Sequence, residues 1–96
     1  MEKTLKTDLY LSFDNDYKLY QCLESLNRTK SQRKSAKELN ISHTVFNRRI
    51  LKAESKLGIK LTQKKGNGSA LTNEGVRLLE EYRKYLIQIA EPNNIN

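Results

Sequence analysis

Two helical patterns separated by a very short turn constrain this chain more than any other feature of its sequence. Ser31 can cap a short helix over residues 32–39, and Ser42 can cap a longer helix over residues 43–57. Asn40 stands between them, and asparagine tolerates the left-handed backbone conformation that ends a helix. A short helix, a tight turn and a longer helix together predict a helix-turn-helix motif.

The longer predicted helix has an apolar face and a polar face. Four apolar side chains recur with the helical period and predict an inward stripe: Phe46, Ile50, Ala53 and Leu57. The opposite face carries the side chains that we expect to reach base edges in the major groove of DNA: His43, Thr44, Asn47, Arg48 and Lys52. Arg48 can pair with guanine through two hydrogen bonds, and Asn47 can pair with adenine in the same way. Leu51, at the shoulder of this face, either contacts a thymine methyl group or packs on the short helix.

Alternation and helical spacing predict elements on both sides of this motif. A strand over 8–13 and a helix over 16–28 precede it. After Gly58, the pattern predicts a strand over 59–62, a glycine-containing turn over 64–68, a return strand over 69–71 and a long helix over 73–90 that Thr72 caps.

The expected fold class is therefore mainly α with a small β component. It is a winged helix-turn-helix made of a strand, three helices, a two-stranded wing over 63–69 and a long C-terminal helix. The length of 96 residues fits one domain, which we place at 1–91, with a flexible tail over 92–96. Gly66 and Gly68 are expected to make the wing mobile.

Positive charge is concentrated in the middle of the chain. Residues 30–65 carry eleven Lys/Arg and two acids, a net charge of +9, whereas the remaining residues carry a net charge of −2. Such a block is typical of a surface that binds a polyanion, although a solvated, salt-bridged surface is the alternative. We assign phosphate contacts to the region of the short helix, at Ser31, Arg33, Lys34, Lys37 and Ser42. On the wing, we assign contacts to a flanking minor groove or backbone at Lys64, Lys65 and Asn67.

The helix over 73–90 carries two apolar stripes, more than one small domain needs to cover. We therefore predict a homodimer whose interface includes Leu78, Leu79, Tyr82, Tyr85, Leu86 and Ile89. The alternative is a helix fully buried in a monomer.

Other kinds of site find little support in the sequence. The single Cys22 lies on the inner stripe of its helix, and with His43 as the single histidine the chain offers too few ligands for a metal site. No nucleophile–base pair is discernible, so we predict no enzyme activity, no cofactor and no small-molecule ligand. No apolar run is long enough to span a membrane or to act as a signal peptide, which favours a cytoplasmic location.

Two known families resemble this sequence. The stretch SAKELNISHTVFNRRILKAESKLG, residues 35–58, resembles the N-terminal domain of LysR-type regulators. The stretches DLYLSFDNDYKLYQCLESL and LTQKKGNGSALTNEGVRLLEEY look like the DNA-binding domain of ModE, the molybdate-responsive regulator. Asn40, Gln32 and Ala53 depart from the usual Gly, apolar residue and Leu. The resemblance implies a DNA-binding transcription regulator that pairs through its last helix.

Both families usually continue into a ligand-sensing domain, so we expect this chain to lack effector binding. Two rival functions remain open on the sequence. One is a sequence-blind architectural or chromatin protein, and the other is a protein-interaction adaptor with the same fold.

Overall fold

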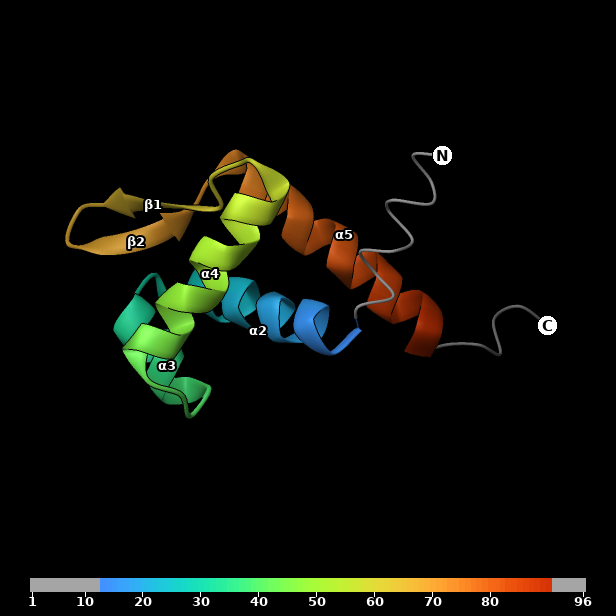
Figure 1. Ribbon diagram of the computed structural model, residues 1–96, viewed down its shortest axis with the longest axis horizontal. Helices are drawn as coiled ribbons and strands as arrows, with labels where there is room; N and C mark the ends of the chain where they lie inside the picture. Colours follow the sequence, from blue (N-terminus) through green and yellow to red (C-terminus); the bar gives the residue numbers. More distant parts are fainter. Residues whose placement is uncertain (1–12, 91–96) are drawn as a thin grey trace.

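The computed structural model describes residues 13–90, which form helices and one small antiparallel sheet (Figure 1). The elements in chain order are α2 (Phe13–Thr29), α3 (Gln32–Glu38), α4 (His43–Leu57), β1 (Thr62–Lys65), β2 (Gly68–Leu71) and α5 (Asn73–Ala90). The predicted fold class, mainly α with a two-stranded wing, is confirmed. No described helix is long and apolar enough to cross a membrane.

Both helices of the helix-turn-helix begin where the caps predicted, and α4 ends at Leu57 as expected, whereas α3 ends at Glu38, one residue early. The hydroxyl of Ser31 accepts a hydrogen bond from the N–H of Lys34 at 3.2 Å, and that of Ser42 accepts one from the N–H of Val45 at 3.0 Å. Asn40 has the expected positive φ of 60° between α3 and α4. Each hydroxyl satisfies an N–H group that the first turn of a helix leaves without a partner.

The predictions for both ends of the chain fall mostly outside the described residues. The strand predicted over 8–13 lies outside the described residues except for Phe13, where α2 begins, so that residue is helical instead. The tail over 92–96 also lies outside the described residues.

The wing, expected over 63–69, spans 62–71, and its first strand begins later than predicted. We expected a strand over 59–62, but β1 begins at Thr62 and pairs with β2 in the register Thr62↔Leu71 to Lys65↔Gly68. The reason is the buried Glu54, whose carboxylate accepts the N–H of Leu61 at 2.8 Å and the N–H of Thr62 at 3.4 Å. These bonds hold the link after α4 against that helix, so the ladder starts beyond it.

Two glycines allow close backbone contacts around the wing. A Cβ on Gly68 would lie 2.4 Å from the carbonyl oxygen of Lys30, and a Cβ on Gly75 would lie 2.3 Å from that of Leu61. The same Lys30 oxygen accepts the N–H of Ser69 at 3.0 Å. The missing side chain of Gly68 therefore lets the N–H of Ser69 bond to the end of α2, and the mobility expected of the wing stays a prediction.

The core lies around α2, which contacts α3, α4, α5 and β2. Its largest fully buried side chains come from four parts of the chain: Leu23 and Leu26 of α2, Phe46 and Ile50 of α4, Leu61 before the wing, and Leu79 of α5. Burial of these apolar side chains supplies the main drive for folding. It also presses one face of α4 inward and leaves the opposite face outside.

Candidate nucleic-acid interface

The outer face of α4 presents every predicted base-reading side chain to solvent. His43, Thr44, Asn47, Arg48 and Lys52 are all exposed, whereas Phe46 and Ile50 on the opposite face are buried. Thr44, Asn47 and Arg48 also line one shallow hollow together with Leu51 and Lys52. The structure thus brings most of the predicted readers onto one continuous surface.

His43 has a neighbour that the sequence did not predict. Its Nε2 lies 3.0 Å from the side-chain oxygen of Gln32 at the start of α3. Gln32 stands where the resembling families usually place an apolar residue, and this polar contact gives the departure a role. It ties the N-terminal ends of α3 and α4 to each other and holds one of the two ring nitrogens of His43.

The cations of α3 face solvent beside the start of α4. Arg33, Lys34 and Lys37 are exposed, and Arg33 and Lys37 share a hollow with Ser42 and His43. A polyanion lying along α4 would meet these cations at its flank. The predicted phosphate contacts therefore adjoin the predicted base contacts in space.

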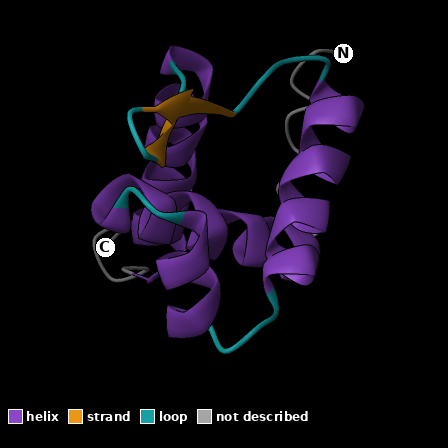
Figure 2. Cartoon of the chain, turned by 90° about the vertical axis from the view of Figure 1, so that its left-hand side faces the viewer, coloured by secondary structure: helices purple, strands orange, loops and turns teal. Residues whose placement is uncertain are grey.

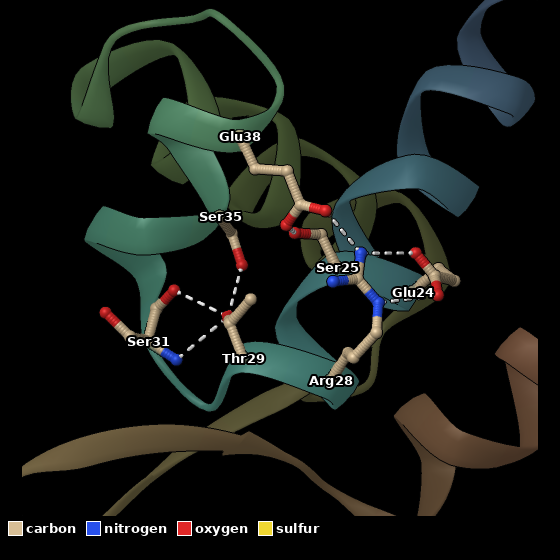
Figure 3. Close-up of polar contacts among 7 residues, drawn as sticks. All are labelled: Glu24, Ser25, Arg28, Thr29, Ser31, Ser35 and Glu38. Carbon is tan, nitrogen blue, oxygen red and sulfur yellow. Dashed lines mark hydrogen bonds and ion pairs between the residues drawn. The ribbon is translucent and has the colours of Figure 1, made fainter.

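A polar cluster fixes α3 against α2 (Figure 3). The carboxylate of Glu38 accepts hydrogen bonds from the guanidinium of Arg28 at 2.6 Å and from the hydroxyl of Ser25 at 2.8 Å. Arg28 and then Ser25 hold the pKa of Glu38 below its usual value. A second contact of 2.8 Å joins the hydroxyls of Thr29 and Ser35. These contacts set the position from which α3 presents its cations.

The wing lies at the same end of the molecule as α3 and α4 (Figures 1 and 2). Its predicted contacts, Lys64, Lys65 and Asn67, are exposed at and beside the turn, where Gly66 has a φ of 59°. The C-terminal part of α5 points away from this end (Figure 1).

Sequence reasoning missed two features of α4. Glu54 counted only as an acid within the basic block, yet it is 8% exposed and positions the wing through the backbone of Leu61 and Thr62. Its place beside the inward stripe, one residue after Ala53, was the signal that could have revealed it. The second feature is Arg49, which lines a groove of about 310 Å³ between α2, α4 and α5. Burial raises the pKa of the nearby Cys22 thiol, and Arg49 opposes that shift.

The predicted dimer interface on α5 needs a correction at two positions. Leu79 and Tyr82 are 1% and 2% exposed because they pack in the chain's own core, so they are not available to a partner. Leu78, Tyr85 and Leu86 are half-buried, and the side chain of Ile89 is not among those that the structure describes. Ile87, which was not predicted, is 57% exposed.

Comparison with known proteins relates this chain to helix-turn-helix regulators. Residues 17–76 match the family model described as bacterial regulatory helix-turn-helix protein, lysR family. An uncharacterized HTH-type transcriptional regulator of Methanocaldococcus jannaschii is 39% identical over 87 residues, which cover 84% of this chain and 30% of that protein. The chain thus spans about a third of the length of this relative.

Solved structures show the same fold. The DNA-binding domain of CbnR, in complex with DNA, has a TM-score of 0.70 at 22% identity over 81% of this chain and 90% of that chain. Vibrio fischeri DarR, also in complex with DNA, has a TM-score of 0.68 at 25% identity over 80% of this chain and 26% of that chain.

Proposed function

The chain belongs to the lysR family of bacterial regulatory helix-turn-helix proteins, and from that premise we propose that it binds double-stranded DNA sequence-specifically. In this proposal α4 enters the major groove, α3 contacts the phosphate backbone, and the wing reaches a flanking minor groove or the backbone. The family is one of regulators, so the consequence of binding is control of transcription.

One observation carries the proposal: the outer face of α4 joins base-reading side chains to flanking cations. Asn47 and Arg48 are exposed on that face, and neither belongs to the core that folds the chain. Arg33, Lys34 and Lys37 lie beside it on α3. Specific DNA recognition needs both parts, because phosphate contacts position a protein and base contacts specify the sequence. CbnR and DarR, which share the fold, were both solved in complex with DNA, which supports DNA as the ligand.

Replacement of Arg48 and replacement of Lys65 are expected to have different consequences. Arg48→Ala should weaken binding to a selected site by about 1–3 kcal/mol and relax the base preference, because it removes a paired contact to a base. Lys65→Ala should weaken binding to all duplexes alike, because a phosphate contact carries no base information. Fluorescence anisotropy with a duplex selected from a random pool and with a scrambled duplex measures both effects.

Lys84→Ala is the matched control, because Lys84 is an exposed cation on α5, outside the proposed DNA interface. It removes the same charge and should change neither affinity nor preference. Equal affinity of the native chain for selected and scrambled duplexes would favour an architectural protein. Absence of binding to both would favour a protein-interaction adaptor.

We further propose that the chain pairs with a second copy through α5. Ile87 is exposed and Tyr85 and Leu86 are half-buried on its C-terminal part, and Tyr17 of α2 is exposed and stacks on Tyr20 at 6.0 Å. Apolar surface of this kind is typical of an interface. A two-fold pair would present two copies of α4 to half-sites about 34 Å apart.

A charge placed on α5 should separate such a dimer. Ile87→Glu is expected to shift sedimentation equilibrium toward the monomer, because a carboxylate buried between two copies loses its hydration. Arg77→Glu, at an exposed position in the N-terminal part of the same helix, serves as the control and should leave the association unchanged. A native chain that sediments as a monomer at every concentration would exclude this proposal.

A further inference from the structure

Leu51 is an exposed apolar side chain on the outer face of α4, beside the polar side chains proposed to read bases. It is 51% exposed, and among the four exposed large apolar side chains of the described residues it is the one on α4. This exposure argues against packing on α3, because a side chain packed there would have lost most of its contact with water. Leu51 stays accessible on the outside of the helix-turn-helix.

The neighbours of Leu51 are the proposed base readers. It follows Asn47 by four residues and Arg48 by three, and these spacings place side chains on the same face of a helix. Leu51 lines a shallow hollow with both of them and with Thr44 and Lys52. A duplex that fills this hollow would therefore contact Leu51 together with Asn47 and Arg48.

The chemistry of the major groove limits what can lie against this side chain. Every base pair presents hydrogen-bond donors and acceptors in the major groove. The apolar group presented there is the C5-methyl group of thymine. An isobutyl group pressed on a polar base edge would remove water from it without replacing the hydrogen bonds. Against a thymine methyl group, the same isobutyl group buries apolar surface on both sides and is favoured.

We propose that Leu51 reads a thymine methyl group in the half-site that Asn47 and Arg48 contact, and that it thereby excludes other bases at that position. This inference rests on the proposed function, since it takes α4 to lie in the major groove. It adds a specificity-determining residue to the two polar readers. The preference that it creates is apolar, so it differs in kind from hydrogen-bond reading.

Deoxyuridine is the direct probe, because it differs from thymidine only by the missing C5-methyl group. A duplex is first selected from a random pool, and each thymine of the half-site is then replaced singly by deoxyuridine. For the native chain, one replacement should raise the Kd about fourfold, the factor that corresponds to one buried methyl group. In Leu51→Ala the same replacement should leave the Kd unchanged.

The variants keep the test independent of folding. Leu51→Ala replaces an exposed side chain by the best helix former, so its thermal unfolding should match that of the native chain. Ile59→Ala removes an exposed apolar side chain that borders Leu51 but does not line the hollow with Asn47 and Arg48, and it should retain the fourfold response to deoxyuridine.

The outcomes separate this inference from the proposed function. Selective binding that no deoxyuridine substitution weakens overturns the role of Leu51 and leaves DNA binding intact. So does a response that persists in Leu51→Ala or disappears in Ile59→Ala. Failure to select any duplex from the pool overturns the proposed function, and the role of Leu51 with it.

Discussion

Affinity for duplex DNA is expected to fall roughly five-hundredfold per protomer between 50 and 200 mM salt, because lysine and arginine side chains that bind phosphates release the counterions condensed on them. The proposed phosphate contacts include five cationic side chains: Arg33, Lys34, Lys37, Lys64 and Lys65. Each neutralised phosphate contributes about −0.9 to the slope of log affinity against log salt, so the slope should be near −4.5. A dimer on two half-sites should double that slope. Anisotropy titrations at four or more salt concentrations measure it.

Single substitutions test whether the named cations are responsible. Lys34→Ala should make the slope less steep by about one, since one phosphate fewer is neutralised. Lys84→Ala removes an equal charge from α5 and should leave the slope as it is. A slope near zero, or an equal change in both variants, would contradict the proposed interface.

Glu54→Leu is expected to reduce the free energy of unfolding by roughly 2–4 kcal/mol, because it leaves two backbone N–H groups without their acceptor. Those groups belong to Leu61 and Thr62, where the chain passes from α4 into the wing. The contact of 3.8 Å to Lys60 adds little, because that lysine side chain is 79% exposed. Urea denaturation measures the change in stability.

Glu54→Gln provides the matched comparison. Its amide oxygen can still accept from the two N–H groups, so the loss should be about 1 kcal/mol or less. Hydrogen exchange at Leu61 and Thr62 should accelerate in the leucine variant and stay close to native in the glutamine variant. Equal destabilisation by both substitutions would show that charge, rather than hydrogen bonding to the wing, is what Glu54 supplies.

Local sequence predicted most of the elements because their determinants are local. The capping hydroxyls of Ser31 and Ser42, the left-handed Asn40 and the apolar period of α4 act within a few residues of themselves. The start of β1 could not be predicted in this way. It depends on the carboxylate of Glu54, which accepts hydrogen bonds from the N–H groups of the residues seven and eight positions later. The alternation of the strand does not reveal these bonds.

In the candidate site, too, local features could be predicted and features that depend on tertiary contacts could not. The exposure of Asn47 and Arg48 followed from the inward stripe of α4, whereas the contact between His43 and Gln32 depends on how two helices meet. The assignment of Leu79 and Tyr82 to an interface was wrong because an apolar stripe does not show which surface covers it. Both side chains pack in the core of their own chain.

By its order of residues alone, this chain determined where α3, α4 and α5 start, which side of α4 is polar, and where positive charge is concentrated. These properties depend on neighbours within one or two turns and on composition. Tertiary structure alone decided that Leu51 stays outside, that Gly68 and Gly75 admit a backbone oxygen, and which part of α5 is left for a partner. Such properties arise from contacts between residues distant in the sequence, and the hydrophobic periodicity of the sequence does not predict those contacts.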